Sequence, residues 1–203
     1  MILAPARVLS GDALRDRLGG SLGETLGQEL GVNASGFSSG SSRPIIRGLE
    51  GARVKILQNG MSSGDLSAIS NDHAVGSPVG TARQIEILRG PAALLYGSGA
   101  IGGLVNIVND RIPTALEPGD YRIPGNSSIY GDGDQGRLSF SGNRERSLGF
   151  GASLIRDWGY VGASLSTLDK LYGIRGADEK SKIDLNQTRV DVDSMLRAPF
   201  DDI

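Results

Sequence analysis

The chain has 203 residues, contains no cysteine, and carries 21 basic and 23 acidic side chains, which gives a formal net charge of −2. The absence of cysteine excludes disulfides, thiolate metal sites and cysteine nucleophiles, and the balanced charge, without a basic patch interleaved with aromatics, argues against nucleic acid as a partner. Glycine is frequent, at 31 residues, and no apolar run reaches the ~18 residues that a membrane-spanning helix needs.

The N-terminal region predicts two short helices. Ser10, Gly11 and Asp12 precede a helical segment at residues 13–18. Ser21 is a second N-cap candidate, and Glu24 at the third helical position completes a capping box for a helix over residues 22–30. Gly31 would end that helix, because glycine adopts the left-handed conformation of a C-cap without strain.

Strand-like segments follow a flexible loop at residues 37–42. The segments 44–47, 53–58 and 84–88 are rich in isoleucine, valine and leucine, and Asn59-Gly60 is a turn signal. Residues 1–112 therefore predict a small α+β domain.

The segment from residue 97 to 102 reads GSGAIG, a literal match to the G-x-G-x-x-G dinucleotide fingerprint. That fingerprint requires a strand before the glycines and a helix after them. Here the order is reversed: residues 91–96 predict a helix that begins at a proline, and residues 104–108 predict a strand. The glycines Gly97, Gly99, Gly102 and Gly103 are therefore expected to form a tight turn or to allow close backbone packing.

Beyond Pro113 the helical signals disappear. Residues 113–136 form a linker rich in glycine, aspartate and serine, and the segments 137–141, 149–154 and 161–166 alternate apolar with small polar residues. Such strands occur in a membrane β-barrel, and also in a soluble β-sandwich whose dry core takes the apolar face. The pattern by itself leaves both open. Trp158, in a short turn at 157–159, would lie near the interface of a membrane.

Four segments together resemble the plug domain of TonB-dependent outer-membrane receptors: RPIIRG from residue 43, VKILQNG from 54, QIEILRGPAALLYG from 84 and GGLVNI from 102. The resemblance implies an α+β plug domain inside a transmembrane antiparallel β-barrel of about 22 strands. It also implies the cell outer membrane of a Gram-negative bacterium, the TonB complex as energy source, and a receptor rather than an enzyme, without a resident cofactor. Arg47 and Arg89 would form ion pairs with glutamates of the barrel.

Under this resemblance the chain divides into a plug at 1–112, a linker and first barrel turn at 113–136, and an incomplete set of N-terminal barrel strands at 137–203. At about ten residues a strand, there is room for about the first four strands. Both ends look like cuts, no TonB-binding box is recognisable before Leu9, and the chain is expected to be a truncated fragment.

A narrower resemblance concerns the transported ligand. The stretch NDHAV from residue 71, together with YGI from 172 and IDLNQTR from 183, resembles the zinc-uptake branch of these receptors. In that branch an Asp-His pair of the plug contributes metal ligands, which here implies Asp72 and His73. Carboxylate oxygen and imidazole nitrogen both coordinate Zn²⁺, and further ligands would come from parts of the barrel outside this chain.

Two alternatives remain beside zinc import. The branch often carries a histidine-rich stretch after the YGI element, and residues 175–182 contain no histidine. The receptor could instead import an iron-siderophore or another metal chelate, whose site would use aromatics and arginines, although residues 64–79 contain neither. A plug-like binding module that transports nothing is the second alternative.

Overall fold

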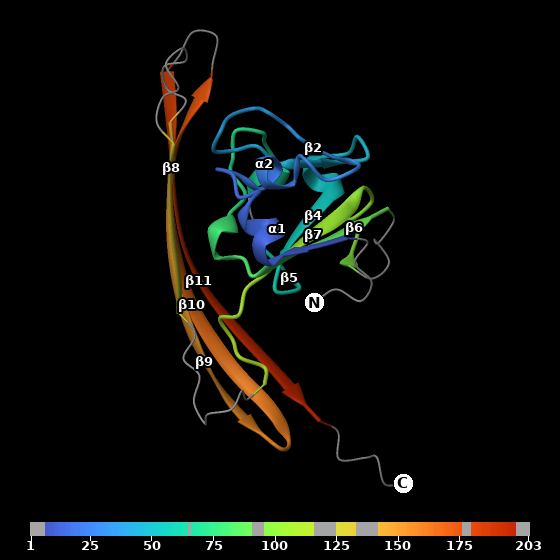
Figure 1. The fold of residues 1–203 in the computed structure, drawn as a ribbon, viewed down its shortest axis with the longest axis vertical. Coiled ribbons are helices and arrows are strands. Elements are labelled where there is room, and N and C mark those ends of the chain that lie inside the picture. Colours follow the sequence, from blue (N-terminus) through green and yellow to red (C-terminus); the bar gives the residue numbers. More distant parts are fainter. Residues whose placement is uncertain are drawn as a thin grey trace.

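The computed structural model describes residues 7–64, 66–90, 96–115, 125–132, 142–175 and 180–197. Short helices and strands up to residue 108 form an N-terminal unit. Four strands from residue 125 onward form an antiparallel sheet that curves around one side of this unit (Figure 1).

A five-stranded mixed sheet is the centre of the N-terminal unit. Its order is β1-β6-β7-β4-β5, and its only parallel pair within the described residues is β4 with β7. A separate hairpin pairs β2 with β3. The strand bounds are β1 (Arg7–Ser10), β2 (Val32–Ala34), β3 (Pro44–Ile46), β4 (Val54–Gln58), β5 (Met61–Ser62), β6 (Gln84–Arg89) and β7 (Gly103–Val108).

The strands predicted at 44–47, 53–58, 84–88 and 104–108 are confirmed to within one residue at each end. The Asn59-Gly60 turn is confirmed as well, because both residues have the positive φ that such hairpin turns require. β1 was not predicted. Its four residues contain only two apolar side chains, and antiparallel pairing with β6 makes it a strand.

The helices are shorter than predicted. They are α1 (Gly11–Arg15) and α2 (Leu22–Leu26), with 3-10 turns η1 (Gly51–Arg53), η2 (Leu66–Ala68) and η3 (Val79–Thr81). The prediction of α2 through residue 30 is wrong, since the helix ends at Gly27 and Leu30 is 85% exposed. Only the first turn and a half of that segment faces the core. No helix among the described residues is long and apolar enough to cross a membrane.

The capping box of α2 is confirmed. The hydroxyl of Ser21 accepts a hydrogen bond from the backbone N–H of Glu24 at 3.3 Å, and the Glu24 carboxylate accepts one from the N–H of Gly20 at 2.9 Å. The bond to Ser21 satisfies an amide that the first turn of a helix leaves without an intrahelical partner, whereas the Glu24 carboxylate reaches back to the residue just before the N-cap.

Replacing Ser21 by alanine is expected to lower the free energy of unfolding of the N-terminal unit by about 1 kcal/mol, because one capping bond is lost. Urea unfolding measures the change. Ser10 is the matched control: it caps α1 by position, but its side chain makes no capping hydrogen bond, so Ser10→Ala should change stability much less. Equal effects of the two changes would contradict the assignment.

The core lies between the mixed sheet and the helices. Aliphatic side chains of both form one buried cluster: Leu9, Leu14, Leu22, Leu26, Val32, Ile46, Val54, Val75, Val79, Ile85, Ile87, Val105 and Ile107. A smaller cluster on the other side of the sheet contains Leu57, Ala100 and Leu104. The apolar segments of the sequence are therefore buried as their patterns predict.

The second sheet has the order β11-β10-β9-β8 and is antiparallel throughout. Its strands are β8 (Gly125–Asp132), β9 (Asn143–Arg156), β10 (Gly159–Arg175) and β11 (Lys180–Leu196). β8 lies inside residues 113–136, which were expected to be a linker and turn. Its polar, glycine-containing sequence carries little strand signal, and pairing with β9 holds it in the sheet. The predicted strand at 137–141 and helix at 91–96 lie outside the described residues, apart from Tyr96.

The two faces of this sheet differ in polarity. Leu148, Phe150, Leu154, Val161 and Leu165 are exposed on the face turned away from the N-terminal unit. Alternate residues on the opposite face are buried and mostly small or polar, and this face also carries Tyr160, Leu168 and Tyr172. The polar members are Asn143, Glu145, Ser147, Ser164, Ser166 and Lys170. In a soluble sandwich the apolar face would be the packed one, so this arrangement favours the barrel alternative.

Candidate ligand site

The loop of residues 70–75, here named the apex loop, follows η2 and contains Asp72 and His73. It turns through a backbone hydrogen bond from His73 N–H to the oxygen of Ser70 at 3.4 Å. Ala74 and Val75 are buried, and Val75 belongs to the main core cluster. The loop is therefore anchored at its C-terminal end, while Asn71, Asp72 and His73 keep partial exposure.

A tyrosine of the second sheet holds the backbone of this loop. The hydroxyl of Tyr172, on β10, donates to the backbone oxygen of Asp72 at 2.7 Å and accepts from the N–H of Ala74 at 2.9 Å. The side chain is almost completely buried. Since both partners are backbone groups, the side chains of Asp72 and His73 stay available for other contacts.

Two oxygen atoms of the apex loop are buried without a hydrogen-bond partner among the described residues. They are Oδ1 of Asn71 and Oδ1 of Asp72. A hydrogen bond from the Ser70 side chain lowers the pKa of Asp72 below its usual 3.8, which keeps the carboxylate charged at neutral pH. Two free acceptors, one of them charged, are suited to a cation or to hydrogen-bond donors of a ligand.

The structure places Asp72 and His73 side by side in the apex loop, as their adjacency in sequence requires. Within the described ranges, no group of three or more His, Asp or Glu side chains is arranged to hold a metal ion. A zinc site takes four ligands, of which a catalytic or open site draws three from the protein. The assignment of Asp72 and His73 as ligands therefore stays a prediction that depends on residues outside the described part.

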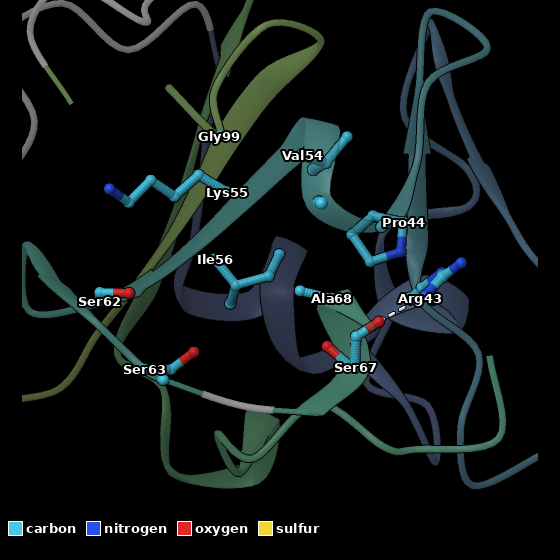
Figure 2. Close-up of a pocket in the computed structure, with 13 residues that line it drawn as sticks. Arg43, Pro44, Val54, Lys55, Ile56, Ser62, Ser63, Ser67, Ala68 and Gly99 are labelled. Atoms are coloured by element: carbon cyan, nitrogen blue, oxygen red, sulfur yellow. Dashed lines mark hydrogen bonds between the residues drawn. The ribbon is translucent and has the colours of Figure 1, made fainter. Parts of the chain in front are cut away.

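A cavity of about 270 Å³ lies beside β4 and η2 (Figure 2). Arg43 stands at one side of it and donates from Nη1 to the backbone oxygen of Ser67, while its Nε contacts Glu50 Oε2 at 3.3 Å. Lys55 extends from β4 and donates to the backbone oxygen of Tyr96. The remaining lining is mixed, with Pro44, Val54, Ile56, Ala52 and Ala68 beside the hydroxyls of Ser62 and Ser63. Glu50 offsets the charge of Arg43, and the cavity combines polar groups with apolar walls, as sites for organic ligands do.

Arg47 and Arg89 both lie beside Gly31. The N–H of Arg47 donates to the oxygen of Gly31 at 3.2 Å, and Nε of Arg89 is 4.0 Å from the position that a Cβ on Gly31 would take. Neither arginine belongs to an ion pair between described residues, and Arg89 Nε is buried without a partner there. Arg47 is exposed and Arg89 is half-buried, so only the buried Nε of Arg89 calls for a partner. The pairing of both arginines with carboxylates elsewhere in the receptor stays a prediction.

The glycine-rich segment is packed against the backbone. Gly102 donates to the oxygen of Arg53 at 2.8 Å and accepts from the N–H of Gly90 at 3.2 Å. A Cβ on Gly102 would lie 2.8 Å from Leu49 Cβ, and one on Gly103 would lie 2.4 Å from the oxygen of Leu88. Gly99 faces the oxygen of Ala52, and Gly97 has a φ of +92°. The glycines thus meet close backbone contacts, and β7 rather than a helix follows them.

Polar side chains of β9 and β10 dock onto the loop before α2. Lys170 Nζ donates to the oxygen of Gly20 and to Glu145 Oε2, both at 2.9 Å, and Asn143 Nδ2 donates to the same oxygen of Gly20 at 2.9 Å. Asn143 also reaches the oxygen of Ser39 at 3.3 Å. The Lys170–Glu145 pair is buried within the sheet. The bond from Lys170 to Gly20 joins the sheet to the N-terminal unit.

The model of the TonB-dependent Receptor Plug Domain family matches residues 2–104, just over half of the chain. The chain belongs to this family. The N-terminal unit is the plug. The sequence resemblance to the plug of TonB-dependent receptors is thereby confirmed at the level of the family.

Solved structures with the same fold include siderophore receptors. A ferric enterobactin receptor mutant of Pseudomonas aeruginosa in complex with enterobactin is 21% identical, with a TM-score of 0.59 over 82% of this chain and 25% of that chain. The siderophore receptor PirA of Acinetobacter baumannii is 17% identical, with a TM-score of 0.56 over 96% and 34%. The ferric yersiniabactin uptake receptor of Yersinia pestis is 22% identical, with a TM-score of 0.52 over 83% and 32%. These likenesses establish the fold, and the chain spans a quarter to a third of those proteins.

Sequence reasoning missed the residues that connect the plug to the sheet. Asn143, Glu145, Lys170 and Tyr172 occupy alternate positions of β9 and β10 on the face toward the plug. Long polar or aromatic side chains among the small residues of this face were the available signal. Arg43 was also missed as a neighbour of η2, because 24 residues separate it from Ser67.

Proposed function

We propose that this chain is the plug and first barrel strands of an outer-membrane receptor that imports a metal chelate of the siderophore class, powered by TonB. The observation that carries the proposal is a plug seated on the polar face of a sheet whose other face is apolar. An apolar outer face suits lipid, and a polar inner face suits a barrel lumen. Family membership and the likeness to siderophore receptors support a receptor rather than an enzyme.

The composition of the plug supports a chelate as ligand. Residues 64–79 contain no arginine, but the fold brings Arg43 from another loop into contact with Ser67 within that stretch. Leu66 and Ile69, beside the apex loop, are 52% and 81% exposed. Exposed apolar side chains beside polar groups suit an organic molecule that wraps a metal ion, whereas leucine and isoleucine provide no ligand atoms for a bare Zn²⁺.

Zinc is the second candidate, and one observation favours it. The unpartnered oxygens of Asn71 and Asp72 lie next to His73, and oxygen and imidazole ligands both suit Zn²⁺. The comparisons give zinc no support, since the similar structures are receptors for ferric siderophores.

Uptake of ⁵⁵Fe-labelled ferric enterobactin and of ⁶⁵Zn²⁺ by cells that express the full-length gene product tests the proposal. We expect iron accumulation that disappears in cells without TonB. Arg43→Ala should raise the KM for the ferric chelate about tenfold or more, because a hydrogen bond to a charged group contributes about 1.5–3 kcal/mol. Arg83→Ala, which removes an exposed arginine paired with Asp110, is the matched control and should leave uptake unchanged.

His73→Ala separates the two candidates. A chelate receptor should keep its iron uptake with this change, whereas a zinc receptor should lose ⁶⁵Zn²⁺ uptake at normal surface expression. Zinc uptake that depends on both TonB and His73, without uptake of ferric chelates, would replace the proposed function by zinc import. No TonB-dependent uptake of any ferric siderophore or of zinc would overturn both.

A further inference from the structure

Two loops of the plug converge on Tyr172. Its hydroxyl bridges the backbone of Asp72 and Ala74 in the apex loop. Its ring packs on Gly40, where an added Cβ would lie 2.3 Å from Tyr172 Cβ and 2.4 Å from Cγ. A single side chain of β10 therefore fixes the distance between these loops and the sheet.

The neighbouring strand strengthens the same connection. Asn143 of β9 is the register partner of Tyr172, and its side-chain amide donates to the backbone oxygen of Ser39 at 3.3 Å, next to Gly40. The pair Asn143–Tyr172 thus holds both loops from one position along the sheet. Elsewhere on β10, Lys170 donates to the backbone oxygen of Gly20, and Ser166 to Leu168 lie beside Gly76 and Pro78.

The chemistry of the phenol explains why tyrosine suits this position. A phenolic hydroxyl can donate and accept at the same time, and here it does both with two backbone groups of one loop. In phenylalanine the ring would remain, but one buried carbonyl oxygen and one buried N–H would lose their partner, which is unfavourable. The contact constrains the loop backbone and leaves Asn71, Asp72 and His73 free to meet a ligand.

We infer that Tyr172 is a positioning residue that holds the apex loop in its ligand-receiving conformation and couples this loop to the end of β10. We call the contacts of Tyr172 with Asp72, Ala74 and Gly40 the clamp. It rests on the two hydrogen bonds of the hydroxyl and on the packing against Gly40. Its effect on ligand binding rests on the proposed function.

The clamp is tested through the mobility of the apex loop. The 203 residues contain no cysteine, so Ile69→Cys, at an exposed position beside the loop, gives a single site in this region for a nitroxide spin label. Spectra are compared between the full-length gene product with Tyr172 intact and its Tyr172→Phe and Gly40→Ala variants, all in outer-membrane preparations. The first variant removes the hydroxyl and the second displaces the ring.

Tyr160→Phe is the matched control. Tyr160 lies on the same strand, and its hydroxyl donates to Asp193 Oδ2 at 3.0 Å within the sheet rather than to the plug. We expect a more mobile label in Tyr172→Phe and Gly40→Ala and an unchanged label in Tyr160→Phe. Unchanged mobility in both test variants, or an equal increase in the control, would overturn the clamp.

Uptake of ferric enterobactin decides whether the clamp positions a ligand site. We expect Tyr172→Phe to raise KM about fivefold to tenfold with Vmax retained, since two hydrogen bonds that order the loop are lost. A mobile label with an unchanged KM would overturn the positioning role. If the receptor with intact Tyr172 imports no ferric chelate, the proposed function fails, and the spectra still decide the clamp by the same criterion.

Discussion

Replacing Lys170 by methionine is expected to lower the free energy of unfolding of the plug by about 3–5 kcal/mol, the largest effect that we predict for a single side chain of the sheet. The change leaves Glu145 as an unpaired buried charge and removes one of the two side-chain donors to the oxygen of Gly20. The side chains of the pair are only 3% and 9% exposed, so water cannot replace the lost partner.

The stability is measured by urea titration of the detergent-solubilised full-length gene product. A cysteine introduced at the fully buried Ala100 reports opening of the plug through its reaction with a thiol reagent. The double change Lys170→Met with Glu145→Gln should be less destabilising than Lys170→Met alone, because no charge is then left buried without a partner.

The exposed ion pair of Arg83 and Asp110 is the comparison for Lys170. The side chain of Arg83 is 66% exposed, and pairs of this kind contribute about 0–1 kcal/mol. Arg83→Met should therefore shift the titration by less than about 1 kcal/mol. A loss that is the same for Arg83→Met and Lys170→Met would show that the buried pair does not hold the plug to the sheet.

Replacing Gly103 by alanine is expected to destabilise the plug by roughly 3 kcal/mol or more, the sum of a backbone and a packing effect. Gly103 begins β7 with a φ of +146°, and its Cβ would lie 2.4 Å from the backbone oxygen of Leu88. Since that oxygen belongs to the paired strand β6, relief of the clash requires the two central strands of the plug to separate.

Gly48→Ala isolates the backbone effect. Gly48 also has a positive φ, of +79°, but an added Cβ would meet nothing within 4 Å. This change should cost only about 1–2 kcal/mol, from the conformation alone. The same cysteine at Ala100 reports both variants, and similar losses for the two glycines would contradict the packing role of Gly103.

The family of this chain and the elements of its plug could be read from the sequence, because the signals for them are local. Apolar runs predicted strands β4, β6 and β7 of the mixed sheet, and Ser21 with Glu24 predicted the start of α2. No strand was predicted at the positions of β1, β2, β5, β8 and β11. β1 and β8 have weak local signals and owe their strand conformation to pairing with β6 and β9.

Two features could not be predicted from the sequence because they depend on which part of the protein packs against an element. These are the end of α2 and the side of the second sheet that faces the plug. Residues 22–30 have helical character, but α2 ends at Leu26, and Leu30 beyond it is exposed and has no core to contact. Similarly, alternation along β9 and β10 determined which residues share a face. Alternation cannot say whether that face turns toward a second layer or away from it, since both arrangements use the same period of two.

By itself the sequence determined plug-family membership, strands β4, β6 and β7 of the mixed sheet, the cap of α2 and the glycines before β7. These features depend on backbone preferences and on side chains close together in the chain. Only the tertiary structure decided which residues join the plug to the sheet and which arginine reaches η2. The Tyr172 hydroxyl meets a loop about a hundred residues earlier, and Arg43 meets Ser67 across 24 residues. Contacts at such separations arise from packing of whole elements. The residue pattern marked Tyr172 as unusual on its face of β10, but it gave no indication of which loop the side chain contacts.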